Sequence, residues 1–354
     1  MSTLAPASAR VREHRGSMGH TIWSARGEWR ERRSLIVELE TTTGIIGIGE
    51  ASPLPGYSAE DIDAARLALE TFCAAKLPTL DLDDPVEAAR SLARFHAPKS
   101  PSARFAIETA CLDAIARTIG CGLAALFESG SRTARATSLV SLFEPEPRLS
   151  HAIELGITSF KCKIGRLGEF DRELAALGRL RTALPTGAHL RVDVNGAWSP
   201  AQATQRILAV ADQGATLVEQ PCAPADMAKL LPGPVPIAVD ESLASGVVGD
   251  ELGPLIESGQ IAAFVIKPAI VGGLAAAWDL ARVANRAGVV PIISHLLDGP
   301  VALAACAELA VATDSSLAAG LECHQGLAAW PAISIPQFVG GEIRTCGKGL
   351  GVFT

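Results

Sequence analysis

The sequence predicts an α/β protein made of a closed (β/α) barrel and a small α+β domain that precedes it. From about residue 136 onward, short apolar runs alternate with amphipathic segments rich in Ala and Leu. This alternation is typical of parallel βα units, and seven or eight such units indicate a closed barrel. An open doubly wound sheet is the alternative, but it usually carries a Gly-rich phosphate turn after its first strand, which this sequence lacks.

Seven apolar runs are the expected barrel strands. They are Ser138–Leu142, Ser159–Ile164, His189–Val194, Leu217–Glu219, Ile237–Asp240, Ala263–Ile266 and Val290–Ile293. Each run has the length of a buried strand and precedes a helical pattern. We therefore place the barrel at residues 121–324. The Gly- and Pro-rich segment from about 325 to 354 does not continue this rhythm, and we expect it to pack back onto the N-terminal domain.

The first 120 residues predict the α+β domain. Residues 34–49 alternate apolar and polar side chains around a Thr-Thr-Gly turn, which predicts a hairpin after a polar N-terminus. Helical periodicity then appears at residues 59–76, with Ser58 as the N-cap, and again at residues 102–118. Strands followed by helices indicate a domain separate from the barrel.

Composition favours small-molecule chemistry. The 354-residue chain is 48% hydrophobic and has a net charge of −7, so it offers no basic surface to a nucleic acid or a membrane. Its eight cysteines contain no C-x-x-C pair, and the first twenty residues lack the apolar run of a secretory leader. We expect a cytoplasmic enzyme with reduced thiols and without nucleic-acid or membrane partners. A homo-oligomer is left open.

Two lysines end the second expected strand. Lys161 and Lys163 are two residues apart, so their side chains project from the same face. Ammonium groups that lie close together, beside a metal, lower the pKa of a lysine that acts as a base near neutral pH. A pair of solvated lysines on a surface strand is the alternative interpretation.

Three acidic residues end the next three expected strands. Asp193 shares a strand face with Arg191 and Asn195, Glu219 follows 26 residues later, and Asp240 follows after a further 21. Each step equals one βα unit, so three neighbouring strands deliver one carboxylate apiece to one rim of the barrel. Such an all-oxygen set is what Mg²⁺ prefers. Any one of these acids, considered without the other two, could instead be the N-cap of the following helix.

A third lysine ends the following strand. Lys267 comes 27 residues after Asp240 and precedes Pro268, which stops the strand ladder. It lies four strands beyond Lys163, about halfway around an eight-stranded barrel, so we expect the two lysines to face each other across the metal. An ordinary lysine that extends its ammonium group to solvent is the alternative.

These motifs together resemble the enolase superfamily, in its muconate-cycloisomerase-like subgroup. They are Lys161-x-Lys163, Asp193-x-Asn195, Val218-Glu219-Gln220-Pro221, Asp240-Glu241-Ser242 and Val265-Ile266-Lys267-Pro268, and the resemblance covers about residues 30–330. It implies a (β/α)₇β TIM-like barrel with an N-terminal α+β capping domain. It also implies Lys163 and Lys267 as acid/base lysines, with Mg²⁺, or Mn²⁺ as an alternative, held by Asp193, Glu219 and Asp240.

Within this subgroup the chain most resembles the o-succinylbenzoate synthase family. The loop Gly49–Ser58 resembles that family's capping loop, and Val265–Leu274 resembles its lysine strand. The resemblance implies dehydration of 2-succinyl-6-hydroxy-2,4-cyclohexadiene-1-carboxylate in menaquinone biosynthesis, with Lys163 as the base and Lys267 remaining cationic. The residues expected to bind this carboxylate substrate are Pro55, Lys161, Arg191, Asn195, Ser294, His295 and Asp298.

The chain departs from that family where many members carry serines followed by Glu. Here the segment reads Ser294-His295-Leu296-Leu297-Asp298. His295 is either an extra acid/base group or a hydrogen-bonded pocket residue, and we expect the pocket role. Cys323 and His324 are expected to be structural, because adjacent strand residues point to opposite faces.

Three other functions remain open. An N-acylamino acid racemase or dipeptide epimerase would use the two lysines in turn, and a muconate cycloisomerase would keep the same metal and lysines. A barrel that binds a carboxylate without catalysis is the alternative from a different class, although a binder has no need for opposed bases.

Overall fold

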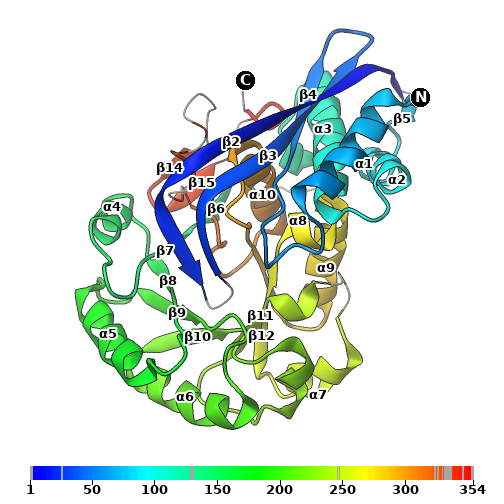
Figure 1. The fold of residues 1–354 in the computed structure, drawn as a ribbon. Coiled ribbons are helices and arrows are strands. Elements are labelled where there is room, and N and C mark those ends of the chain that lie inside the picture. Colours follow the sequence, from blue (N-terminus) through cyan, green and yellow to red (C-terminus); the bar gives the residue numbers. More distant parts are fainter. Residues whose placement is uncertain are drawn as a thin grey trace.

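An antiparallel sheet backed by three helices forms the N-terminal part of the molecule (Figure 1). The computed structural model describes residues 3–24, 27–127, 131–244, 246, 248–322, 324, 327–328, 330, 337–344 and 347–351. The sheet order is β2 (Pro6–Ser24), β3 (Gly27–Thr41), β4 (Ile46–Ala51), and the helices are α1 (Ile62–Ala74), α2 (Pro85–His96) and α3 (Pro101–Ile119). A short pair joins β1 (Thr3–Leu4) to β5 (Leu80–Asp81). The predicted hairpin is confirmed as β3 and β4.

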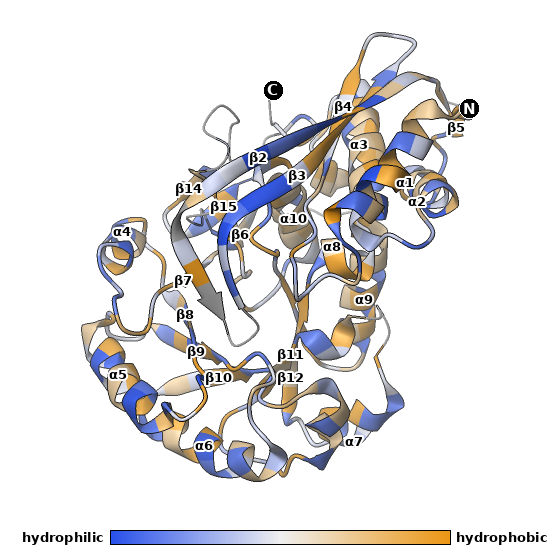
Figure 2. Cartoon of the chain, in the orientation of Figure 1, coloured by the Kyte–Doolittle hydropathy of each residue, from blue (hydrophilic) through white to orange (hydrophobic). Residues whose placement is uncertain are grey.

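The long strand β2 lies in the polar N-terminal stretch, for which the sequence predicted no strand. It pairs with β3 along most of its 19 residues. Some of its polar side chains are paired with β3, because Arg10 and Arg12 both reach the carboxylate of Glu38. Figure 2 shows hydrophilic residues along much of β2 and the first half of β3. An edge strand that is held by charged cross-strand pairs shows little apolar alternation, so its periodicity is weak.

The first helix begins later than expected. Asp61 is its N-cap and accepts a hydrogen bond from the Ala64 N–H at 2.8 Å. The Ser58 hydroxyl instead accepts from the Leu54 N–H at 2.9 Å, so the prediction of Ser58 as the cap is wrong. Ser58 therefore closes the loop before the helix. The prediction also misses α2, which begins after Asp84 as its N-cap.

Seven parallel strands form the barrel sheet in chain order. They are β7 (Thr137–Leu139), β8 (Ser159–Lys163), β9 (His189–Asp193), β10 (Ala215–Glu219), β11 (Ile237–Val239), β12 (Ile261–Ile266) and β13 (Val290–Ile293). Residues 319–320 close the ring, because Ala319 bridges Ala136 beside β7 and Gly320 bridges Ser294 beside β13, both in parallel. The expected (β/α)₇β barrel with a separate N-terminal domain is confirmed.

Helices of varied length connect these strands on the outside of the barrel (Figure 1). The α-helices are α4 (Arg148–Glu154), α5 (Phe170–Ala183), α6 (Pro200–Asp212), α7 (Gly253–Glu257), α8 (Pro268–Val271), α9 (Leu274–Arg286) and α10 (Pro300–Thr313). The 3₁₀ turns are η1 (Leu123–Phe127), η2 (Pro224–Lys229), η3 (Glu241–Leu243) and η4 (Asp250–Leu252). Among the described residues, no helix combines the length and apolarity that crossing a membrane requires.

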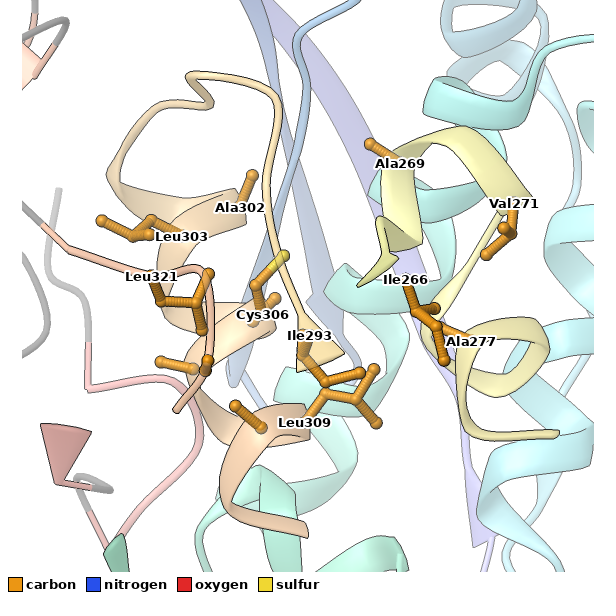
Figure 3. Close-up of a cluster of buried hydrophobic side chains, with 14 of the residues drawn as sticks. Ile266, Ala269, Val271, Ala277, Ile293, Ala302, Leu303, Cys306, Leu309 and Leu321 are labelled. Atoms are coloured by element: carbon orange, nitrogen blue, oxygen red, sulfur yellow. The ribbon is translucent and has the colours of Figure 1, made fainter. Parts of the chain in front are cut away.

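Helix α10 is buried on every side. All of its residues from Pro300 to Thr313 are buried, and they are mostly Ala, Val and Leu. Figure 3 shows its side chains Cys306 and Leu309 beside Ile293 of β13, and Leu303 on the other side of the helix near Leu321. A helix that is apolar all round belongs inside a protein. Here the helix packs against both the barrel and the N-terminal domain.

Two buried carboxylates of the N-terminal domain cap barrel helices. Glu50 accepts hydrogen bonds from the N–H groups of Val301 and Ala302 at 3.1 Å each, at the start of α10. Glu108 accepts from the Ala275 N–H at 2.6 Å, at the start of α9. Helix N-termini present unpaired N–H groups and a partial positive charge, so these contacts attach the two parts of the chain to each other.

The last described strands return to the barrel. β14 (Gln337–Val339) pairs with β15 (Glu342–Arg344), which pairs with β6 (Thr133–Arg135). The Leu350 N–H donates to Asp113 of α3 at 2.8 Å, so part of the tail also contacts the N-terminal domain. Much of the predicted 325–354 segment lies outside the described residues, and the domain boundary near residue 120 stays a prediction.

Candidate active site

Backbone register brings the expected site residues to one rim of the barrel. Lys163 is paired with Asp193 across β8 and β9, and Asp193 is paired with Glu219 across β9 and β10. Asp240 follows β11 directly, and Lys267 follows β12. Because all of these strands are parallel, their carboxyl ends meet at the same rim. The structure thus brings the three acids and the three lysines together.

Each acid of this group is paired with a lysine. The Lys161 Nζ lies 2.8 Å from Glu219 Oε1 and 3.1 Å from Asp193 Oδ2. The Lys163 Nζ lies 3.1 Å from the same Asp193 oxygen, and Lys267 pairs with Asp240. The acid side chains are at most 5% exposed, so these charges are mutually compensated in a nearly dry site.

The charges shift the pKa values of the group in opposite directions. Burial lowers the pKa of Lys161, but the carboxylates of Asp193 and Glu219 outweigh it and raise that pKa above its ordinary value. Burial is likewise outweighed at Lys267, chiefly by Asp240. The pKa of Lys161 is thus shifted in the direction opposite to that expected for a pair of lysines. The reason is that its nearest charged neighbours are acids, which outweigh the second ammonium group.

The two acids next to Lys161 differ from each other. Burial raises the pKa of Asp193, but three lysines outweigh it and hold that pKa below its usual range. The pKa of Glu219 is raised by burial and by the negative charge of Asp193. Asp193 is therefore the more firmly ionised member of the pair.

Amide side chains orient the charged groups. The Asn195 Oδ1 accepts from the Lys163 Nζ at 2.9 Å, and the Asn195 Nδ2 donates to Glu241 at 3.3 Å. The Gln220 Oε1 accepts from the Asp240 N–H at 2.9 Å, while its Nε2 donates to Ser242. Asn195 and Gln220 both have positive φ, 50° and 38°, a strained conformation that often occurs at functional sites. Gln220 belongs to a motif of the sequence, but the motif did not predict this role for it.

The three carboxylates are not arranged as a ready metal cage. Across the described parts of the chain, no group of three or more His, Cys, Asp or Glu residues has an arrangement that could hold a metal ion. The carboxylates of Asp193 and Glu219 nevertheless converge on one cationic centre, the Lys161 Nζ. Carboxylate oxygens from adjacent strand ends are the donor set that suits Mg²⁺.

A cavity of about 80 Å³ lies above this charged floor. Lys161, Lys163, Asp193 and Lys267 contribute to its lining, as do Ser294 and His295. Its apolar roof consists of Ile22, Trp29, Leu54, Tyr57, Leu296 and Leu297. A second pocket of about 220 Å³ adjoins it and shares Lys163, Arg148 and His324 with it. The size and mixed lining suit a small organic acid.

Four residues expected to bind substrate do not line either pocket. Arg191 is buried and donates to the Ala318 carbonyl at 2.9 Å, where it supports the barrel closure. Pro55 is exposed, and its carbonyl accepts from Trp29 Nε1 at 3.1 Å. Asp298 is fully buried beside Arg32, at 3.8 Å. Such roles depend on loop geometry, which a motif does not reveal. Asn195 also lies outside the lining and acts through Lys163.

Several residues that line the cavity were not predicted from the sequence. Trp29 and Tyr57 form the roof and come from the N-terminal domain, and the Lys267 Nζ lies 5.6 Å from the Tyr57 ring centroid. His324 was expected to be structural, yet it lines both pockets and stacks on His295 at 4.7 Å between ring centroids. An aromatic residue within the Pro- and Gly-rich loop was the one available signal, at Tyr57.

Comparison with protein-family models covers both parts of the chain. Residues 8–127 match the mandelate racemase/muconate lactonizing enzyme N-terminal domain, and residues 148–353 match the enolase C-terminal domain-like family. The two matched ranges correspond to the N-terminal α+β part and to the barrel part of the structure. The chain therefore belongs to the enolase superfamily. Within the superfamily it is muconate-cycloisomerase-like.

Similar proteins carry different activities. The chain is 28% identical over 331 residues to the hydrophobic dipeptide epimerase of Enterococcus faecalis, covering 91% of each. It is 32% identical to muconate cycloisomerase 1-1 of Acinetobacter lwoffii, over 78% of this chain and 74% of that one. It is 28% identical to the o-succinylbenzoate synthase of Thermosynechococcus vestitus, over 79% and 81%. The superfamily is supported, whereas the individual reaction is not resolved.

Solved structures share the fold. A dipeptide epimerase from Enterococcus faecalis, complexed with Mg and the dipeptide L-Leu-L-Tyr, has a TM-score of 0.85 at 24% identity. The match covers 99% of this chain and all of that one. At this identity the likeness establishes the architecture and leaves the substrate open.

Proposed function

We propose that this protein removes the proton next to a substrate carboxylate with the help of a bound Mg²⁺. The further proposal is that it acts as an o-succinylbenzoate synthase, dehydrating 2-succinyl-6-hydroxy-2,4-cyclohexadiene-1-carboxylate in menaquinone biosynthesis. The main support for this proposal is that Lys163 and Lys267, which come from strands four apart, line one cavity together with Asp193. Two ammonium groups and buried acids in one small cavity are more than a binding protein requires.

Asp193, Glu219 and Asp240 would hold the metal. Their oxygens are nearly dry and are neutralised here by lysine ammonium groups, so a divalent cation would take over a charge-balancing role that already exists. When bound, Mg²⁺ supplies positive charge that stabilises the substrate carboxylate and the enediolate formed from it. Mn²⁺ has the same preference for oxygen ligands.

The two lysines would have different roles in the reaction. Lys163, held by Asn195 and Asp193, would accept the α-proton in its neutral amine form as the C–H bond breaks, and would become an ammonium group. The same ammonium group would return this proton to the departing hydroxyl as the C–O bond breaks, so that water leaves and an aromatic ring forms. Lys267, ion-paired with Asp240, would remain cationic and stabilise the enolate.

Charge in the cavity favours this substrate over a free dipeptide. Among the described residues that line it, the acids are Asp193 and Glu322, and Glu322 is already paired with Arg148 at 2.9 Å. A dipeptide ammonium group would thus meet only carboxylates that have other cationic partners. Burial lowers the pKa of His324 to about 3, so it is uncharged at pH 7 and forms no ion pair with an ammonium group. An acid without a free amine fits better.

Racemisation of an N-acylamino acid is the second candidate. It requires a base on each face of the α-carbon, and the placement of lysines on two strands four apart supports it. An N-acylamino acid also lacks a free ammonium group, so the cavity charge does not distinguish it from the dehydration substrate.

The two candidates are separated by assays with the purified protein and Mg²⁺. We expect loss of the cyclohexadiene absorbance with the dehydration substrate, and slower deuterium incorporation from D₂O into N-succinylamino acids. Exchange into N-succinylamino acids without any dehydration would favour the racemase. Epimerisation of free dipeptides would contradict the charge argument, and turnover of none of these acids would contradict the proposed function.

The metal assignment has a test that does not depend on turnover. Glu219→Gln removes one anionic ligand, and we expect Mg²⁺ affinity measured by calorimetry to fall by at least about tenfold, or about 1.4 kcal/mol. Asp226→Asn, which changes an acid on the 3₁₀ turn η2, is the control and should bind Mg²⁺ normally. Wild-type affinity in Glu219→Gln would overturn the assignment.

A further inference from the structure

Arg32 is a buried cation between the N-terminal domain and the barrel. It comes from β3, is 2% exposed, and directs its guanidinium group toward two loops that are far apart in the sequence. Toward the N-terminal loop it donates to the Ser52 carbonyl and hydroxyl, and to the Pro53 carbonyl at 3.2 Å. Toward the loop after β13 it donates to the Leu297 carbonyl at 2.9 Å.

Both loops contribute to the roof of the cavity. Leu54 directly follows the first set of acceptors, and Leu297 is itself one of the second set. Arg32 also donates to the Leu296 carbonyl at 3.4 Å. Leu54 and Leu296 belong to one apolar cluster with Met18 and Trp29. One guanidinium group therefore fixes the backbone on both sides of this cluster.

The second loop is linked to the histidine wall as well. The Asp298 carboxylate accepts from the Leu296 N–H at 3.0 Å and faces Arg32 at 3.8 Å. The Asp298 carbonyl is hydrogen-bonded to His324 Nε2 at 2.8 Å. Displacement of this loop would therefore move Leu296 and His324 together, and both of them line the cavity.

Only arginine combines these contacts. Its planar group offers five N–H donors in a fixed fork, whereas a lysine ammonium offers three donors at one point. Burial lowers the pKa of Arg32, while the carboxyl groups of Asp298 and Glu50 oppose that effect. Replacing Arg32 with a neutral residue would leave buried acids without a cation, so a charge-preserving change is the sharper probe.

We propose that Arg32 is a positioning residue that couples the 52–58 loop to the 296–298 loop, so that the roof of the cavity closes as one unit. The proposal rests on the proposed function only in taking this cavity as the place of reaction. Arg32 does not line the cavity, so its effect is transmitted through the two loops.

Hydrogen exchange of Arg32→Lys tests the coupling without any substrate. We expect amides of residues 52–58 and 296–298 to exchange faster together, because the lysine keeps the charge but cannot bridge both loops. In an assay with an acid that the wild-type protein turns over, we expect Arg32→Lys to raise KM about tenfold. This is the effect of losing one hydrogen bond to a charged group, and kcat should change less.

Glu108→Gln is the matched control. It alters another buried contact between the domains, at the start of α9, away from the cavity. We expect it to change stability without faster exchange in the two loops and without a change in KM. If it raises KM as much as Arg32→Lys does, the effect is general loosening of the domains and the proposal is overturned.

A milder variant keeps the test decisive if Arg32→Lys does not fold. Ser52→Ala removes the hydroxyl acceptor alone and should raise exchange at 296–298 as well as in its own loop. Unchanged protection at 296–298 in both variants would overturn the coupling. Failure of the proposed function would appear separately, as a wild-type protein that turns over no acid while the exchange pattern still holds.

Discussion

At the scale of single residues, the lysines differ in their partners more than in their sequence contexts. The Lys163 Nζ contacts Asp193 and a neutral amide, Asn195. The Lys267 Nζ contacts Asp240 and lies over the Tyr57 ring. An ammonium group held by an acid and an aromatic ring is stabilised as a cation. These surroundings support a base at Lys163 and a permanent cation at Lys267.

Replacing each lysine tests these roles. We expect Lys163→Ala to lower kcat for dehydration by about 10²–10⁴-fold, the usual contribution of a general base. Lys267→Arg preserves charge but changes its geometry, so it should retain part of the dehydration and lose all racemisation. Steady-state kinetics with both substrate types measures this. Lys229→Ala, at an exposed lysine on η2, should behave as wild type.

The reverse pattern would contradict the assignment. If Lys163→Ala kept near-normal dehydration while Lys267→Ala did not, the base would be on β12 and not on β8.

At the scale of elements, one close contact joins the sheet of the N-terminal domain to α3. A Cβ atom on Gly49 of β4 would lie 1.9 Å from the Ala106 carbonyl oxygen, and one on Gly47 would lie 2.1 Å from that of Ala110. Strand and helix backbones thus touch directly, which glycine alone permits. The helical pattern at 102–118 was visible in the sequence, but this approach was not.

Substitution at Gly49 tests the contact. We expect Gly49→Ala to lower the free energy of unfolding by about 1–3 kcal/mol, because α3 must move away from β4. Gly253→Ala is the control, since a Cβ there meets no atom within 4 Å. Urea denaturation of both variants measures the difference. Equal midpoints would show that α3 shifts at negligible cost.

At the scale of the whole molecule, buried carboxyl groups connect the two domains. Burial raises the pKa of Glu108 to about 7, although its hydrogen bond from Ala275 opposes the shift. Glu50 shows the same value for the same leading cause. Because these values lie above the unfolded value of 4.5, the folded state binds more protons between pH 4.5 and 7. Their contribution to stability is full below pH 4.5 and is lost as pH rises through 7.

The variant Glu108→Gln should reduce this pH dependence. Gln keeps an acceptor for Ala275 but does not titrate, so the variant should lose less stability than wild type between pH 5 and 8. The difference is on the order of 3 kcal/mol at most, from the shift to about pH 7. Urea titrations at several pH values measure it, with the exposed Glu70→Gln as control. Parallel wild-type and Glu108→Gln profiles would contradict the prediction.

The barrel and the chemistry of its rim could be predicted from the sequence alone. All seven expected strands occur, and the strand-end positions of Asp193, Glu219, Asp240 and Lys267 follow from the βα period. Periodicity and spacing are local properties, so one chain suffices to predict them. The edge strand β2 escaped prediction because charged cross-strand partners, and not apolar alternation, satisfy it.

The surroundings of that rim depend on tertiary contacts that no local pattern predicts. The tertiary structure placed Trp29 and Tyr57 of the N-terminal domain over the cavity, and it turned Arg191 and Asp298 away from it. It also made Lys161 the partner of two acids at once. These contacts join residues whose separation in the chain carries no periodic signal. They arise when a closed barrel and its capping domain exclude water from the same charges, so each charge must find a partner in space.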